Sequence, residues 1–248
     1  MIKNLNKNGF FSVFLALFLY YTARMIKHSP SLPKVSDMCR SMADILSSAA
    51  FYGNLLYTIK IVALGVLIAF ICGTALAIVC SMSDWLYHLI MPIINSTKNV
   101  PSIALFPLFI VLMGIGDAPR IFVIIWNSAY PIISSTLAGL DSVEKEVVEA
   151  AWNCGTTKWQ MYRYIKIPLA FINILEGLKI SAGNGFIAIV VAEMLGATKG
   201  LGYMVLWSAN AFRYPEMYCY ILVIALVGFF INVIIEYIIK LSKERIYT

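Results

Sequence analysis

The sequence predicts an all-α integral membrane protein with about six transmembrane helices and one organised polar segment between two of them. Of the 248 residues, 60% are hydrophobic and the mean hydropathy is +0.81, whereas soluble domains are roughly 45–50% apolar. The apolar residues gather in runs long enough to cross a bilayer, which takes roughly 20 residues. The segment from about Asp141 to Pro168, between two of these runs, interrupts this pattern with many charged and polar residues.

Six apolar runs are the predicted spans, at about residues 10–26, 55–80, 89–113, 121–140, 169–192 and 217–240. The first run resembles a signal peptide in length. However, Arg24 and Lys27 follow it where a small-residue cleavage site would be needed, so we predict a retained span. A short helix along the outer surface is expected between Ser36 and Tyr52, leading into the second span.

The formal net charge of +6 indicates basic loops at a membrane surface rather than nucleic-acid binding. Basic residues at both ends place both termini in the cytoplasm, as an even number of spans requires; they are Lys3, Lys7, Lys240, Lys243 and Arg245. The polar segment adds further basic residues to that side. Three basic residues in the loop after the first span oppose this pattern, namely Lys27, Lys34 and Arg40.

The cysteines and histidines indicate no disulfide framework and no metal site. Three of the five cysteines fall inside predicted spans and no CxxC motif is present, while His28 and His88 are isolated near span ends. Small residues, in contrast, recur at helical spacing on two spans, where they let another helix approach closely. They are Ala69, Gly73 and Ala77 on the second span and Gly177, Ser181 and Gly185 on the fifth.

Polar residues inside the spans are the candidates for a solute path, because charges in a bilayer are costly and are kept for function. The candidates are Asn127, Glu176, Lys179, Ser181 and Asn184. Glu176 and Lys179 are three residues apart and can pair on one helix face. This pair is either structural or part of a gate. Glu193 is expected beyond the outer half of the fifth span, before a glycine-rich loop.

Prolines interrupt the third predicted span at Pro92, Pro101 and Pro107. Each removes a backbone donor and kinks a helix, which a membrane tolerates only where protein or a water-lined cavity covers the freed carbonyls. The kinks are either structural or in contact with the solute. On the second span, Lys60 is expected to snorkel to the interface.

The polar segment is predicted to form a helix, a turn and a second helix. Asp141 and Glu144 fit one capping box, and Thr157 and Gln160 fit another. Gly155 suits the left-handed position that ends the first helix. Around this turn the surface is shallow and carries one carboxylate. Two interpretations remain open: the surface docks in a groove of a partner protein, or the segment is a connecting loop with no partner.

The spacing of this segment resembles a known signature. Glu149-Ala150-Ala151, three residues, Gly155, nine residues and Ile165-x-Ile167-Pro168 resemble the cytoplasmic loop of permease subunits in binding-protein-dependent ABC importers, with Ile167 where leucine is usual. Further motifs resemble the nitrate/taurine/aliphatic-sulfonate subgroup over about residues 55–240. They are Val100–Leu108, Gly114-x-Gly116 and Ala192-Glu193-Met194 leading to Gly200-Leu201-Gly202-Tyr203.

The resemblance implies a type I importer permease in the cell membrane, with the 141–168 loop in the cytoplasm as a coupling loop. The residues implied to dock on the ATPase are Glu149, Ala150, Ala151, Gly155 and Thr156. The implied partners are two ATPase subunits, a second permease and an external solute-binding protein. The chain has no GxxxxGK[ST] motif. ATP and magnesium therefore belong to the partner, and we expect this chain to bind no cofactor and to be no enzyme.

The same resemblance implies an organisation and a solute class. Residues 1–54 hold the N-terminal helix and external loop, residues 55–240 form the core permease domain, and residues 241–248 are a cytoplasmic tail. The solute is expected to be a small oxyanion, a sulfonate or a small organic vitamin precursor. Two alternatives need no ATPase: a small membrane channel, and a membrane-embedded enzyme, which would need paired carboxylates, a histidine cluster or a Ser/Lys dyad.

Overall fold

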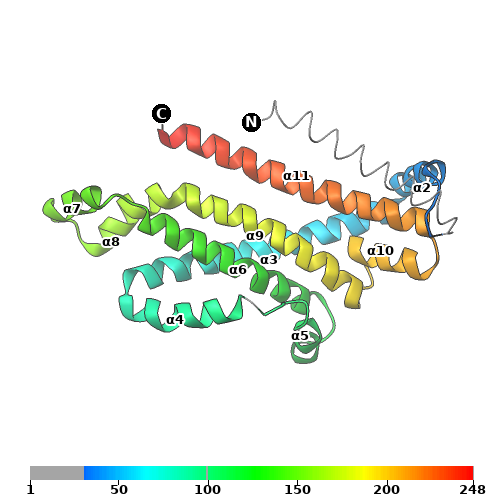
Figure 1. The fold of residues 1–248 in the computed structure, drawn as a ribbon, viewed down its shortest axis with the longest axis horizontal. Helices are drawn as coiled ribbons and strands as arrows, with labels where there is room; N and C mark the ends of the chain where they lie inside the picture. The colour runs from blue at the N-terminus through cyan, green and yellow to red at the C-terminus, as the bar shows by residue number, and fades with distance from the viewer. Residues whose placement is uncertain (1–30, 99, 248) are drawn as a thin grey trace.

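The structure, a computed structural model, describes residues 31–98 and 100–247, and this part of the chain is helical apart from short loops (Figure 1). The predicted first span, residues 10–26, lies outside the described residues. In chain order the elements are α2 (Val35–Ser47), α3 (Ala49–Met82), α4 (Asp84–Thr97), α5 (Phe106–Met113), α6 (Asp117–Asp141), α7 (Lys145–Asn153), α8 (Lys158–Met161), the π-helical turn η1 (Tyr162–Lys166), α9 (Ile167–Gly196), α10 (Leu201–Asn210) and α11 (Tyr214–Tyr247).

Four helical segments in the described part are long and apolar enough to cross a membrane: α3, α6, the continuous run Lys158–Gly196, and α11 over Tyr214–Glu244. They confirm the all-α membrane fold and the spans predicted near 55–80, 121–140, 169–192 and 217–240. The surface helix expected between Ser36 and Tyr52 is present as α2 over its first part. It is followed directly by α3, which starts at Ala49.

The prediction of a single span over 89–113 is wrong. This region forms α4 and α5, two short helices separated by residues 98–105. Tight turns between Pro101 and Phe106 fill part of the gap, with Ala104 N–H donating to Pro101 O at 3.0 Å. Pro107 then occupies the first turn of α5, where its missing N–H has no helical partner to lose. Pro107 thus starts α5, whereas Pro101 lies in the turns between the two helices.

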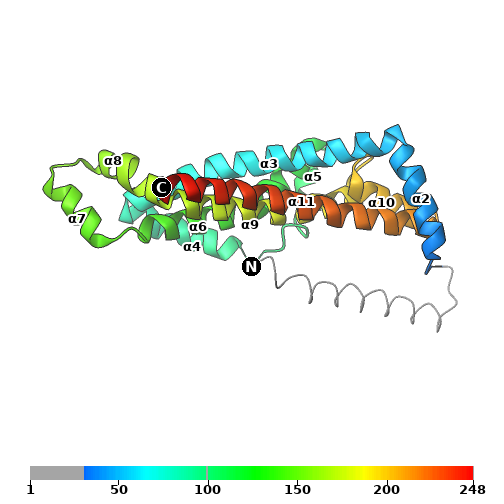
Figure 2. The same cartoon turned by 90° about the horizontal axis from the view of Figure 1, so that it is seen from above.

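Helix α6 lies between α3 and α9 and makes the main contacts of the bundle (Figures 1 and 2). The predicted small-residue faces lie at these contacts: Gly73 packs against Ile132, and Gly185 against Ile124 and Ser128. Any added side chain would meet the α6 surface within contact distance, so glycine sets how closely these helices approach. Close packing of small residues against α6 therefore holds α3 and α9 in the bundle.

The two ends of the bundle differ. Helices α7 and α8 project from one end, whereas α2, α5 and α10 gather toward the opposite end (Figures 1 and 2). Helix α11 runs along the bundle and packs on α2, α9 and α10. Its C-terminal end lies toward the α7–α8 end in both views. Only 17% of its most apolar window is buried, far less than in the other three spans, so most of α11 faces outward.

Candidate functional site

The α7–α8 segment, residues 145–161, begins differently from the prediction. Helix α6 continues through Asp141, and Ser142 N–H still donates to Ala138 O at 3.0 Å. Asp141 therefore ends one helix and is not available to cap the next, so the predicted Asp141–Glu144 capping box is wrong. Glu144 takes the N-cap position of α7 without a side-chain bond. The predicted second box is confirmed: Thr157 and Gln160 cap α8 reciprocally.

The turn between α7 and α8 depends on Gly155, whose φ is +77°. As predicted, this left-handed residue ends α7. Its N–H donates to Trp152 O at 2.9 Å. Thr156 closes the turn by donating to Ala151 O from its hydroxyl at 2.7 Å. No atom lies near the position of an added Cβ at Gly155, so its requirement for glycine is conformational rather than steric.

The predicted docking residues do not all face outward. Glu149, Ala150 and Gly155 are exposed, Thr156 is half-buried, and Ala151 is buried. Two large aromatic side chains of the same segment are also exposed, namely Trp152 at 48% and Trp159 at 58%. Exposed aromatic residues next to a carboxylate are typical of a protein-binding surface. The sequence motif indicated the small residues of this surface but not its aromatic ones.

The α7–α8 segment is tied to the spans at Tyr162. This buried tyrosine follows α8 directly, and its hydroxyl hydrogen-bonds both the carbonyl and the hydroxyl of Ser81, near the end of α3. The π-helical turn 162–166 then leads into α9 at Pro168, where the helical ladder lacks a donor. The α7–α8 segment is therefore joined to α9 by direct continuity and to α3 through Tyr162.

Three of the five predicted path residues line one groove of about 760 Å³ between α9 and α11: Glu176, Lys179 and Asn184. The predicted Glu176–Lys179 pair does not form. Instead, Lys179 Nζ contacts Glu236 Oε2 at 3.1 Å and Lys243 Nζ contacts Glu176 Oε1 at 3.2 Å. Glu176 and Lys179 therefore each form an ion pair with a residue of α11 across the groove, and not with each other along α9.

The other two predicted path residues lie in the α6–α9 contact. Ser181 is fully buried and exchanges hydrogen bonds with Ser128, in which each hydroxyl donates to the other's carbonyl at 2.8 and 3.1 Å. Asn127 donates to Asn184 O at 3.3 Å. Ser181 therefore joins helices and does not line the groove. Sequence reasoning missed Asn232, Glu236 and Lys243, which α11 contributes to the groove.

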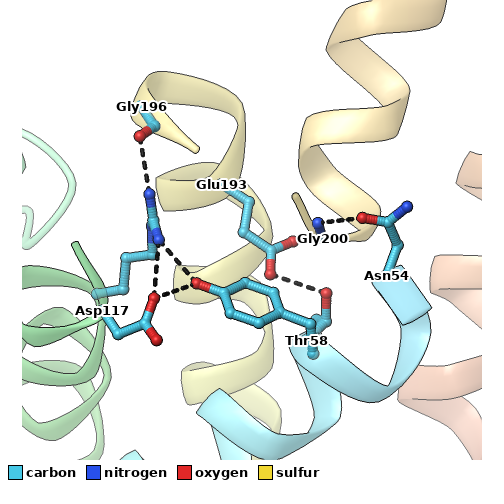
Figure 3. Close-up of polar contacts among 8 residues, drawn as sticks. Asn54, Thr58, Asp117, Glu193, Gly196 and Gly200 are labelled. Carbon is cyan, nitrogen blue, oxygen red and sulfur yellow. Dashed lines mark hydrogen bonds and ion pairs between the residues drawn. The ribbon is translucent and has the colours of Figure 1, made fainter. Parts of the chain in front are cut away.

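A polar cluster, formed by Asn54, Thr58, Glu193 and the 200–202 backbone, lies at the end opposite α7–α8 (Figure 3). Glu193 belongs to α9 and is fully buried, so its predicted place beyond the span is wrong. Its carboxylate accepts from the Thr58 hydroxyl at 2.8 Å and from Gly202 N–H at 2.9 Å. This carboxyl group thus satisfies one of the free N–H groups at the start of α10.

The same cluster explains the glycines that follow Glu193. Gly200 has φ +113°, and its N–H donates to Asn54 Oδ1 at 2.7 Å. A Cβ at Gly200 would overlap the Glu193 carboxylate, and one at Gly202 would overlap the Val190 carbonyl. The Glu193 motif is thus a close-packed cap for α10. Its signal in the sequence is an acidic residue in an apolar helix that precedes Gly-x-Gly.

Arg120 completes this end of the bundle. Its buried guanidinium donates to Gly196 O at the end of α9 at 2.8 Å, and also to Tyr57 and Asp117 (Figure 3). A cation at a helix C-terminus satisfies free carbonyls and the negative end of the dipole. Glu193 and Arg120 therefore hold the start of α10 and the end of α9, respectively, and sequence reasoning missed Arg120.

The chain is similar to known proteins over most of its length. The family described as binding-protein-dependent transport system inner membrane component matches residues 41–247. The formylaminopyrimidine transport permease protein of Halalkalibacterium halodurans is 27% identical over 218 residues, which cover 88% of this chain and 87% of that protein. The taurine transport system permease protein of Escherichia coli is 30% identical over 184 residues, which cover 74% and 67%.

A solved structure of the MetNI methionine ABC transporter in an inward-facing conformation also matches. Its TM-score is 0.70 at 17% identity, over 79% of this chain and 99% of that one. At this identity the likeness shows the fold alone. It confirms the all-helical fold of the bundle.

Proposed function

Because the chain belongs to the family of binding-protein-dependent transport system inner membrane components, we propose that it moves a small solute by alternating access driven through the α7–α8 segment. The chain is a multi-pass permease subunit of an ABC importer, in which the ATPase is a separate subunit. Family membership excludes the channel and embedded-enzyme alternatives. The resemblance to the taurine-type subgroup is likewise confirmed.

The α7–α8 segment docks on the ATPase in this proposal. Its exposed surface carries Glu149 beside Trp152 and Trp159, which suits a partner groove with apolar walls and one basic residue. An ATPase acts in the cytoplasm, so the segment and the C-terminal end of α11 lie there, and the polar cluster around Glu193 faces outward. Two permeases, two ATPases and an external binding protein make the complete importer.

The groove between α9 and α11 is part of the path or its inner gate. Four charged side chains in membrane-spanning helices remain between 31% and 64% exposed there. Charges at such positions face water or protein rather than lipid. Ion pairs that cross between two helices can hold the groove closed and separate when the helices move apart. Lys179 lies about one turn deeper on α9 than Glu176, and Glu236 lies about two turns deeper on α11 than Lys243, so Lys179 and Glu236 are the inner members.

The solute class follows from the relatives. One is named for taurine, a sulfonate, and another for formylaminopyrimidine, a small pyrimidine. We propose a small sulfonate, oxyanion or vitamin precursor for this chain. The groove itself is electrically balanced, with each lysine opposite a glutamate, so it favours neither sign of charge. The external binding protein then carries most of the selectivity.

The single observation that carries the proposal is the exposed, tightly turned α7–α8 segment at the end of a membrane bundle. It is tested by co-purifying the chain with its ATPase and measuring solute uptake. Glu149→Lys and Gly155→Pro should both reduce ATPase retention. Asp37→Lys, an exposed charge reversal on α2 at the opposite end, should retain the ATPase normally. Normal assembly and uptake in both segment variants would overturn the assignment.

A further inference from the structure

A separate pocket between α4 and α6 holds a lysine that lies outside the α9–α11 groove. It is about 180 Å³ and is lined by Lys98, Thr97, Tyr130, Trp126, Phe122 and apolar neighbours. Lys98 Nζ donates to the Tyr130 hydroxyl at 3.3 Å and lies 5.1 Å from the centre of the Tyr130 ring. The pocket thus combines one cation with aromatic walls.

Lys98 lies deep in the membrane-spanning region. Tyr130 is 13 residues after Asp117, the first residue of α6, and 11 residues before Asp141, the last (130 − 117 and 141 − 130). At about 1.5 Å per residue, Tyr130 is roughly 17–20 Å from either end of this span. The Lys98 ammonium is hydrogen-bonded to Tyr130 and shares its depth. A charge at the middle of a bilayer faces a water-filled space or the interior of an assembly, and marks a pathway.

The charge of Lys98 is not balanced by a neighbouring carboxylate. In residues 31–98 and 100–247 there are four ion pairs, and Lys98 takes part in none of them. This differs from the α9–α11 groove, where Lys179 and Lys243 each meet a glutamate. An ammonium group has three donors, and Tyr130 accepts only one. The remaining donors and the positive charge are available to a ligand.

We propose that Lys98 and Tyr130 form a binding subsite for a small anion of the oxyanion or sulfonate type, midway through the bilayer. Tyr130 accepts from Lys98, so its own proton can be donated to the same anion. Trp126 and Phe122, which pack together with centroids 6.4 Å apart, supply an apolar wall for a short organic tail. As a station for the transported solute the subsite depends on the proposed transport function, but anion binding can be measured without transport.

The test uses the full-length chain in lipid nanodiscs and the fluorescence of Trp126, isolated by subtracting the signal of Trp126→Phe. Iodide, an anionic quencher, should quench Trp126 strongly, and methanesulfonate should protect it. In Lys98→Met, quenching by iodide should fall severalfold, because the attracting charge is lost. Quenching by neutral acrylamide should not change. Lys98→Arg should restore iodide quenching. Lys60→Met, an exposed lysine on α3 outside the pocket lining, should leave it unchanged.

Several outcomes would overturn the subsite. They are equal iodide quenching in Lys98→Met and the unmodified chain, failure of Lys98→Arg to restore it, and failure of methanesulfonate to protect Trp126. Loss of a cross-linked permease dimer in Lys98→Met would show instead that a carboxylate of a second copy balances this charge. None of these results depends on ATPase retention, so the subsite can fail while the coupling assignment stands.

Discussion

Glu193 of α9 and Thr58 of α3 are joined by a hydrogen bond of 2.8 Å between the threonine hydroxyl and the carboxylate, and both side chains are fully buried. Each also accepts from the start of α10: Thr58 from Leu201 N–H and Glu193 from Gly202 N–H, both at 2.9 Å. Two side chains from two spans thus satisfy the free donors of a third helix. This relationship fixes the end of the bundle opposite α7–α8.

Thr58→Val should destabilise the protein. The change keeps the shape of the side chain but leaves Leu201 N–H and one Glu193 oxygen buried without this partner, which costs about 1–3 kcal/mol. Thermal unfolding of the chain in nanodiscs measures the effect. Thr58→Ser keeps the hydroxyl and should unfold close to the original temperature. If the serine variant were as unstable as the valine variant, the methyl packing rather than the hydrogen bonds would hold this site.

Gly177→Ala should destabilise the α6–α9 contact, whereas Gly183→Ala should not. A Cβ at Gly177 would lie 2.8 Å from Ser135 Cβ and 3.2 Å from the Pro131 carbonyl, while one at Gly183 meets nothing within 4 Å. Overpacking of this kind costs about 1–3 kcal/mol, and alanine at an open helical position is favourable by up to about 1 kcal/mol. Both variants are compared by thermal unfolding. Equal melting temperatures would contradict the close approach.

Local patterns in the sequence were enough for four of the predicted spans, the small-residue faces and the Thr157–Gln160 cap. Each depends on residues within one or two helical turns: apolar length for a span, a four-residue spacing for a face, a three-residue spacing for a cap. The left-handed turn at Gly155 is local in the same way, because only glycine adopts φ +77° at little cost. These features need no knowledge of the neighbouring helices.

Features that depend on a neighbouring helix could not be predicted. Glu176 and Lys179 have the spacing of an intrahelical pair. However, α11 brings two oppositely charged side chains within reach, so Lys179 pairs with Glu236 and Glu176 pairs with Lys243. Glu193 looked like the start of an external loop, but Thr58 and the 200–202 backbone make its burial possible. Lys98 becomes a candidate binding residue only through its contact with Tyr130, which is 32 residues away in the sequence.

Lys179→Glu should impair transport more than it impairs stability. Its pair with Glu236 is partly exposed, with side chains 31% and 64% accessible, so its contribution to stability is about 0–1 kcal/mol. Two glutamates facing each other would, however, repel across the groove and hold it open. Uptake and ATPase activity of the reconstituted importer measure this. The double exchange Lys179→Glu with Glu236→Lys should recover transport. No recovery, with normal assembly, would show that the position and not the pairing matters.

Tyr162→Phe should uncouple the α7–α8 segment from the spans without releasing the ATPase. The change removes only the hydroxyl that contacts Ser81, so α3 loses a polar contact with the segment while the ring stays in its buried position. The docking surface at Glu149 and Trp152 is untouched. ATPase retention should be normal, and solute transported per ATP hydrolysed should fall. Tyr164→Phe is the matched control, because that side chain is 68% exposed; it should transport normally. If Tyr162→Phe coupled transport as well as Tyr164→Phe, motion would pass from α8 to α9 alone.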